Sequence, residues 1–169
     1  HLGSLRLEAI YTPGHTPEHV SWALYDTSRS EHDPWLIFTG DFLFVGDVGR
    51  PDLLGEAARQ QLAKDLHQSV FERIASLPDH VEIYPAHGPG SLCGKAIGSR
   101  LSSTLGYERR HAPAMQYQPQ PQWTEALLRD MPLAPSYFKR MKQVNAAGPD
   151  ALDHDLPGQQ RIRAKAPPD

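Results

Sequence analysis

The chain has 169 residues, enough for one core of ordinary size and an appendage. Its 17 basic and 20 acidic residues give a net charge of −3, which excludes the broad basic surface that nucleic-acid binding requires. A single cysteine, Cys93, excludes an internal disulfide framework, and no apolar run is long enough to cross a bilayer, so we expect a cytoplasmic protein that binds neither nucleic acid nor membrane.

Three strands are predicted near the start of the chain. Residues 5–11 alternate between apolar and polar, residues 20–25 are rich in strand-forming types, and residues 35–38 form a compact apolar run. Pro13-Gly14 turns the chain between the first two strands, so we expect these two to pair. Residues 26–34 are polar and predict a hairpin loop.

A long helix is predicted over residues 56–77, because large apolar residues recur at every fourth position. This stripe consists of Leu62, Leu66, Val70 and Ile74. Pro78-Asp79 ends the helix, and a further strand is predicted over residues 81–84. A shorter helix is predicted from residue 99 to residue 110.

The chain changes character after residue 112, where prolines become frequent. Residues 1–112 are therefore assigned to the main domain and residues 113–148 to a helical connector, with short helices over 123–130 and 136–144. Residues 149–169 have few large apolar side chains and are expected to form a linker.

Three motifs each place a metal-binding side chain directly after a predicted strand. They are Thr12-Pro13-Gly14-His15-Thr16, Phe38-Thr39-Gly40-Asp41 and Tyr84-Pro85-Ala86-His87. Side chains at strand exits can converge on one rim of a sheet. Imidazole and carboxylate donors together suit iron, zinc or manganese. The sequence therefore predicts a metalloenzyme.

Two glycine-punctuated loops follow the second and third motifs. Arg50 lies in Gly49-Arg50-Pro51-Asp52. Its guanidinium either donates two hydrogen bonds to the carboxylate of a bound ligand or forms an exposed ion pair with Asp52. Cys93 and Lys95 lie in the loop after His87, where they would line the same rim. Cys93 is either a reactive or substrate-contacting thiol or, as is more common, a small buried side chain.

The remaining histidines are not assigned as metal ligands. His19 is expected to support His15 or to pack at the start of its strand. Five others are interpreted as ordinary residues of loops or of the exposed face of a helix: His32, His67, His80, His111 and His154.

Taken in order, the three motifs resemble the second half of a metallo-β-lactamase-fold domain. Residues 38–53, 84–95 and 137–145 are similar to persulfide dioxygenases of the bacterial branch fused to rhodanese-like sulfurtransferase modules. The resemblance implies the αββα sandwich, an α/β fold, represented by its C-terminal half with a helical, proline-rich extension. The superfamily's His-x-His-x-Asp-His loop does not occur in this sequence, so we expect the N-terminal half of the domain to be missing.

The resemblance also implies an activity and a metal site. Persulfide dioxygenases hold one Fe(II) with two histidines and one aspartate, and they oxidise glutathione persulfide with O₂ to sulfite and glutathione. His15 and Asp41 match two of these metal ligands, and the third belongs to the absent loop. His87 is expected to lie beside the metal ligands without binding the iron itself, and to have a catalytic role.

The same resemblance implies where the substrate binds. Arg50 matches an arginine expected to contact the glutathione part of the substrate, and Ser91, Cys93 and Lys95 would lie beside it. The implied partners are the missing N-terminal half, a rhodanese-like module and a second copy of the chain in a homodimer.

Two other interpretations stay open. In a glyoxalase II-like thioester hydrolase, two metal ions such as zinc activate water, His87 becomes a ligand and Asp41 bridges the ions. In an inactive half-domain, His15 and Asp41 have no catalytic role, and the half sheet exposes an apolar face and a long edge.

Overall fold

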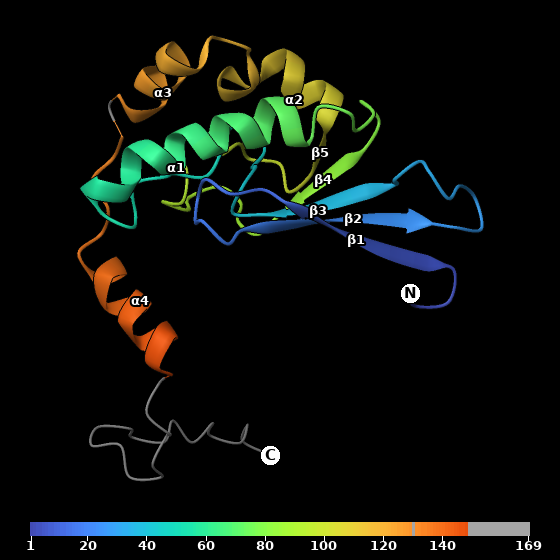
Figure 1. The fold of residues 1–169 in the computed structure, drawn as a ribbon, viewed down its shortest axis with the longest axis horizontal. Helices are drawn as coiled ribbons and strands as arrows, with labels where there is room; N and C mark the ends of the chain where they lie inside the picture. The colour runs from blue at the N-terminus through green and yellow to red at the C-terminus, as the bar shows by residue number, and fades with distance from the viewer. Residues whose placement is uncertain (130, 149–169) are drawn as a thin grey trace, which may run out of the picture. The chain divides into compact units, whose positions relative to one another are not determined.

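The computed structural model describes residues 1–129 and 131–148 (Figure 1). The chain divides into two compact units, His1–Ala134 and Pro135–Asp169. The expected connector, residues 113–148, is thus shared between the two units. Among the described helices, none is both long and apolar enough to span a membrane.

The first unit contains a five-stranded sheet with the order β1-β2-β3-β4-β5. Its strands are β1 (Leu5–Tyr11), β2 (Val20–Asp26), β3 (Leu36–Gly40), β4 (Glu82–Pro85) and β5 (Ser103–Thr104). β1 pairs with β2 and β2 with β3 in antiparallel fashion, whereas β3 and β4 are parallel. The three predicted N-terminal strands and the pairing of the first two are confirmed. As a result, β1, β3 and β4 run in the same direction and end at the same rim of the sheet.

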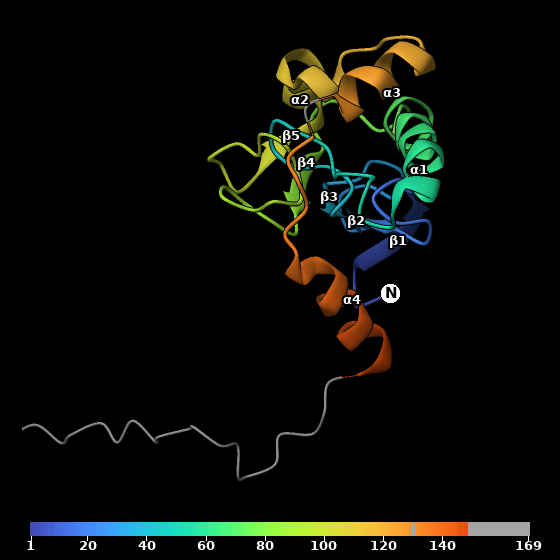
Figure 2. The ribbon, with the colours of Figure 1, turned by 90° about the vertical axis from the view of Figure 1, so that its left-hand side faces the viewer.

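Helices cover one face of this sheet (Figures 1 and 2). They are α1 (Glu56–Gln68), the π-helical turn η1 (Ser69–Arg73), α2 (Leu105–His111), the 3₁₀ turn η2 (Pro113–Met115) and α3 (Gln120–Leu128). The predicted apolar stripe of the long helix is confirmed, because all four of its residues are buried. The second unit contributes helix α4 (Tyr137–Ala147). The predicted linker and His154 lie outside the described residues.

The prediction of one helix over residues 99–110 is wrong in its first half. Strand β5 occupies Ser103 and Thr104, because these residues pair with β4. Helix α2 begins only at Leu105, where the Thr104 side chain accepts a hydrogen bond from the Tyr107 backbone N–H at 3.2 Å. Sheet pairing, which depends on a distant strand, thus determines where this helix starts.

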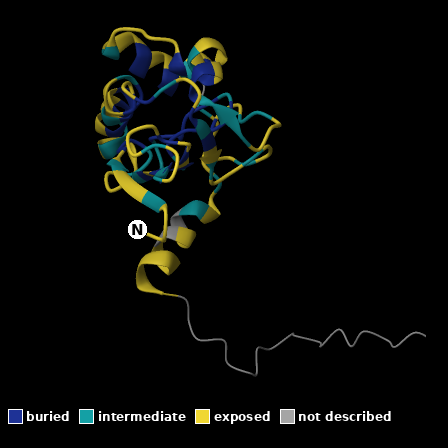
Figure 3. Cartoon of the chain, turned by 90° about the vertical axis from the view of Figure 1, so that its right-hand side faces the viewer, coloured by how far each residue is buried: buried dark blue, intermediate teal, exposed yellow. Residues whose placement is uncertain are grey.

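The core lies between the sheet and the helices, where buried residues are concentrated (Figure 3). Ile37 and Ile83 are fully buried on this face. Because side chains alternate along a strand, the neighbouring Phe38 and Tyr84 point to the opposite face, where they are 43% and 38% exposed. Trp22, the cross-strand partner of Phe38, is also exposed, so an aromatic row crosses this second face.

Candidate metal centre

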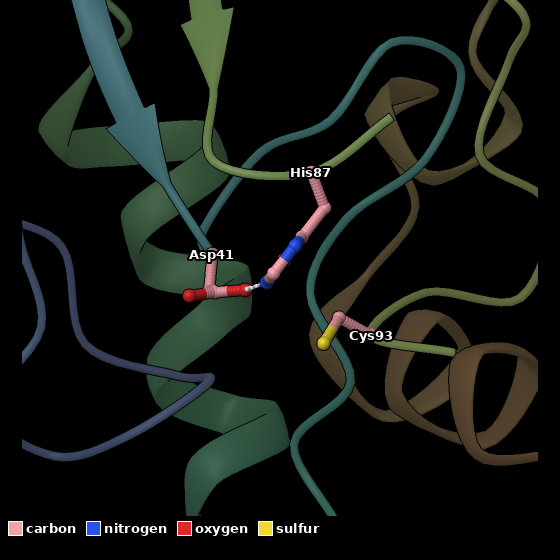
Figure 4. Close-up of side chains that lie close together, drawn as sticks. All are labelled: Asp41, His87 and Cys93. Carbon is pink, nitrogen blue, oxygen red and sulfur yellow. Dashed lines mark ion pairs between the residues drawn. The ribbon is translucent and has the colours of Figure 1, made fainter. Parts of the chain in front are cut away.

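The three sequence motifs meet at the rim where β1, β3 and β4 end. His15 follows β1, Asp41 follows β3 and His87 follows β4. The Ala86 N–H donates to the Gly40 carbonyl oxygen at 2.9 Å, so the parallel pairing continues one step beyond the strands. This bond sets Asp41 and His87 side by side (Figure 4).

The turn that carries His15 rests on helix α1. Gly14 has φ +145°, and a Cβ at this position would collide with the backbone and side chain of Leu66. The Ser69 hydroxyl, at the π-helical turn, donates to the Pro13 carbonyl oxygen at 2.7 Å. Glycine is therefore required for close approach to the helix, and the helix fixes the height of His15 above the sheet.

His15 has the orientation expected of a metal-binding histidine. Its Nδ1 lies 3.0 Å from the backbone carbonyl oxygen of Arg50. A carbonyl oxygen only accepts, so Nδ1 carries the hydrogen and Nε2 carries the lone pair. Metal-binding histidines commonly donate their other ring N–H to a backbone carbonyl in this way.

The backbone of Asp41 is held by His19. The Asp41 N–H donates to His19 Nε2 at 3.1 Å, and His19 Nδ1 lies 2.9 Å from the Thr12 hydroxyl, which in turn bonds the Ser21 hydroxyl at 2.8 Å. Burial, with the nearby His15 as a second cause, lowers the pKa of His19, which favours the neutral ring that this network needs. His19 therefore supports the backbone of Asp41.

Asp41, His87 and Cys93 form a group of three potential metal donors. One donor atom from each lies within 4.8 Å of the other two (Figure 4). Asp41 Oδ1 is 2.9 Å from His87 Nε2, yet Oδ1 is buried and accepts no hydrogen bond from any described residue. The two atoms form an ion pair when His87 is protonated, although they are not aligned as hydrogen-bond donor and acceptor. His15 is not in this group of three.

The Cys93 thiol is held in the protonated form in the absence of a metal. Burial is the main cause that raises its pKa, and the Asp41 carboxylate acts in the same direction, against the opposing effects of Ser91 and Arg50. Cys93 is half-buried, so it is neither a fully buried core residue nor an exposed thiol.

The residues present fit a transition metal. Imidazole and carboxylate donors converge on one rim, one carboxylate oxygen is buried without a hydrogen bond, and His15 is fixed with Nε2 as its metal-binding atom.

Arg50 lies inside the protein, where its side chain is 0% exposed. Its guanidinium donates to both carboxylate oxygens of Asp52, at 2.7 and 2.8 Å. It also donates to the carbonyl oxygens of Leu92 at 3.2 Å and Pro132 at 2.5 Å. The expected pair with Asp52 is therefore present but buried, and Arg50 joins three loop segments of the first unit.

Lys95 and Ser91 are placed differently from each other. Lys95 Nζ donates to the carbonyl oxygens of Arg129 and, at 3.4 Å, Ala126, so it caps the C-terminal end of α3. The Ser91 hydroxyl accepts the Cys93 N–H at 3.2 Å. Ser91 thus belongs to the immediate surroundings of Cys93, whereas Lys95 is bound to a helix end.

Two acidic residues that hold the rim loops together were not singled out in the sequence. The buried Asp47 carboxylate accepts the Val48 and Ala96 N–H groups, each at 2.8 Å, and so joins the loops that follow β3 and β4. Glu108 of α2, also buried, accepts the Gly46 N–H at 2.7 Å. Gly46-Asp47 has the sequence of an ordinary turn, and nothing in the local pattern shows that both carboxylates are buried.

His67 was expected in a loop or on the exposed face of a helix, and that expectation is wrong. It lies on α1 and is buried. Its Nε2 is 3.0 Å from the Gln118 carbonyl oxygen, and its ring contacts Phe71 and Trp123. The segment containing α3 covers this position, which the helical pattern of α1 alone does not reveal.

The chain was compared with known proteins, and no family model matches it. Human persulfide dioxygenase ETHE1 is 41% identical over 165 residues, which cover 98% of this chain and 51% of that protein. The crystal structure of a metallo-β-lactamase from Staphylococcus aureus has a TM-score of 0.77 and 40% sequence identity, over 86% of this chain and 41% of that one. The chain has a metallo-β-lactamase fold.

A second solved structure agrees with this assignment. ETHE1 from Myxococcus xanthus has a TM-score of 0.65 and 25% sequence identity, over 87% of this chain and 56% of that one. The predicted fold class is thereby confirmed, and the chain is homologous to the ETHE1 persulfide dioxygenases. It spans about half the length of human ETHE1.

Proposed function

We propose that the chain is part of a non-haem iron persulfide dioxygenase that oxidises glutathione persulfide with O₂ to sulfite and glutathione. Its likeness to ETHE1 proteins supports this function. The single observation that carries the proposal is the rim geometry of Asp41. It lies at the same edge of the sheet as His15 and His87, and its buried Oδ1 is 2.9 Å from His87 Nε2 without accepting a hydrogen bond.

In this proposal His15 and Asp41 hold the metal together with a histidine from the rest of the domain. Bound Fe(II) would supply the redox chemistry between O₂ and the persulfide sulfur. The chain itself fixes the two donors beforehand, because the Arg50 carbonyl orients His15 and the His19 ring holds the backbone of Asp41. Donors fixed by such supporting contacts need little rearrangement when the metal binds.

The substrate is proposed to approach from the loop that follows β4. Cys93 and Ser91 border the rim there, and Lys95 fixes the same loop to helix α3. Arg50 contributes by holding this loop, since its guanidinium is already bound to Asp52 and to the Leu92 carbonyl. We keep a rhodanese-like sulfurtransferase as the proposed partner that exchanges persulfide sulfur with this site.

The test is oxygen uptake with glutathione persulfide by the chain joined to the remaining half of its domain. Asp41→Ala and His15→Ala should each lose bound iron and oxygen uptake together. His80→Ala, which removes a surface imidazole that pairs with Asp33, is the matched control and should keep both. Full iron content and uptake in Asp41→Ala would remove Asp41 from the site and end the proposal.

A glyoxalase II-like hydrolase is the second candidate, and one observation favours it. His87 Nε2 is only 2.9 Å from Asp41 Oδ1. His87 is therefore close enough to the proposed ligand Asp41 to bind a metal ion itself. Asp41 would then bridge two ions. Two zinc ions per complete domain, with thioester hydrolysis and no oxygen uptake, would establish this function. A complete domain that binds no metal would indicate the inactive half-domain.

A further inference from the structure

We propose that Ser69 positions the metal ligand His15 through the loop that follows strand β1. The inference rests on the proposed function, because His15 is one of the two iron ligands named there. Ser69 belongs to the π-helical turn η1, on the far side of the loop from the sheet rim, and it acts through the backbone that leads to His15. It is therefore a positioning residue and not a catalytic one.

The spacing of the apolar stripe explains why the long helix contains this π-helical turn. An α-helix rotates by about 100° per residue, so side chains four positions apart lie about 40° apart around its axis. Leu62, Leu66, Val70 and Ile74 follow one another at this spacing, yet all four are buried. In η1 the Ile74 N–H donates to the Ser69 carbonyl oxygen at 3.3 Å, five positions back. This wider turn reduces the rotation per residue and keeps Val70 and Ile74 directed at the core.

The Ser69 hydroxyl holds the loop that carries His15. Ser69 is 0% exposed, and its hydroxyl donates to the Pro13 carbonyl oxygen at 2.7 Å. A hydroxyl has one hydrogen to donate, and within a helix it either points to solvent or bonds the carbonyl four positions earlier. Here it links segments that lie 56 positions apart. The Pro13 carbonyl belongs to the planar peptide group that joins Pro13 to Gly14, so the bond fixes the orientation of the peptide just before His15.

Neighbouring residues of the helix hold the loop on either side of this bond. Leu66 lies against Gly14, where it leaves no room for a Cβ. The Arg73 guanidinium lies over the Tyr11 ring, 4.8 Å from its centroid. The Tyr11 hydroxyl in turn donates to the Pro17 carbonyl oxygen at 2.5 Å and so closes the loop. The loop is thus held along its length, and its backbone has little freedom to move.

This support complements the contact that orients the His15 ring. The Arg50 carbonyl oxygen lies 3.0 Å from His15 Nδ1, and this bond forms only while the backbone holds His15 at the matching height. Without the Ser69 hydroxyl, the Pro13 carbonyl loses its donor and the loop is free to shift away from helix α1. The ring would then keep its bond to Arg50 for a smaller fraction of the time. Metal affinity should fall, because the ligand is no longer fixed beforehand.

Hydrogen exchange of the His15 ring tests this role without any metal. In the metal-free 169-residue chain the Nδ1 hydrogen is held by the Arg50 carbonyl, so NMR should detect a slowly exchanging imidazole N–H signal that is absent in His15→Ala. We expect Ser69→Ala to raise its exchange rate about tenfold, because the loop opens more often. Thr124→Ala removes another buried hydroxyl, within helix α3, and should leave the rate unchanged. An unchanged rate in Ser69→Ala overturns the proposal.

The Asp41 backbone N–H is an internal control in the same spectra. It donates to His19 Nε2 at 3.1 Å and follows a different strand, β3. If Ser69 acts on the His15 loop, the exchange of the Asp41 N–H should be the same in Ser69→Ala and in the unaltered chain. Equal acceleration of both hydrogens would mean that loss of the hydroxyl loosens the whole rim, and it would overturn a specific role at His15.

A second measurement connects the loop to the metal. In the chain joined to the remaining half of its domain, Ser69→Ala should bind Fe(II) about tenfold more weakly, and Thr124→Ala as tightly as the unaltered protein. Anaerobic competition with a chromophoric chelator measures both affinities. Full affinity in Ser69→Ala would overturn its role in metal binding. If the affinities differ as expected but the unaltered domain takes up no oxygen with glutathione persulfide, the dioxygenase function fails and the role of Ser69 stands.

Discussion

His19 and Asp41 are joined by a hydrogen bond in which the Asp41 backbone N–H donates to the imidazole Nε2 at 3.1 Å. The residue between strand β3 and Asp41 makes this contact possible. Gly40 has φ +53°, and a Cβ there would lie 2.7 Å from His19 Nε2. The glycine of the Thr-Gly-Asp motif therefore leaves space for the ring that orients the proposed metal ligand.

The first prediction concerns this contact. His19→Ala leaves the Asp41 N–H without its acceptor and should weaken metal binding about 10- to 100-fold, as loss of a contact that supports a ligand commonly does. His19→Gln offers an amide acceptor and should recover part of the affinity. Metal affinity is measured by competition with a chromophoric chelator. The control is His111→Ala, which removes an exposed histidine of α2 and should leave metal affinity unchanged. Unchanged affinity in His19→Ala would show that the hydrogen bond does not position Asp41.

The second prediction concerns the buried ion pair of Arg50 and Asp52. Asp52→Ala leaves the fully buried guanidinium without its countercharge and should lower the free energy of unfolding by about 3 to 5 kcal/mol. Glu125→Ala removes an exposed carboxylate that pairs with Arg129 and should change it by less than about 1 kcal/mol. Urea unfolding followed by circular dichroism measures both. Similar small losses in the two variants would mean that the Arg50 pair contributes no more than a surface contact.

The third prediction is the pH dependence of the same pair. Burial raises the pKa of Asp52, but the hydrogen bonds and charge of Arg50 outweigh it, so the pKa is lowered overall. The folded state therefore favours the carboxylate, and the stability it adds is fully present above the unfolded pKa of about 3.9. That stability is lost as the pH falls through the lowered folded pKa.

The stability difference between the unaltered chain and Asp52→Ala should consequently be constant near neutral pH and should shrink below about pH 4. Urea unfolding at a series of pH values measures it. A difference that stays constant into the acid range would contradict the lowered pKa of Asp52.

Much of the site was predictable because it depends on strand direction. The apolar runs before His15, Asp41 and His87 identify strand ends, and strands that run the same way end at one rim. The apolar stripe of the long helix was equally predictable, because its large apolar residues recur at every fourth position. These features are properties of short segments, so a single sequence contains them.

The remaining features depend on partners far away in the sequence. The burial of Arg50 requires carbonyl groups near residues 92 and 132, and the burial of His67 requires the segment that contains α3. The contact between His19 and Asp41 joins residues that are 22 positions apart. Local patterns identify which side chains are capable of such contacts, but only the fold determines which contacts form.

The last prediction concerns the exposed face of the sheet. Trp22, Phe38 and Tyr84 form a row across strands β2, β3 and β4, with exposed fractions of 46%, 43% and 38%. A contiguous apolar face of this kind promotes association. The isolated chain should therefore self-associate as its concentration rises, and the double variant Trp22→Lys with Phe38→Lys should shift it toward the monomer in sedimentation velocity. Leu101→Lys changes an apolar side chain that is 76% exposed outside this row, and it should leave the association unchanged. If the double variant and the control sediment alike, the aromatic row is not the contact surface.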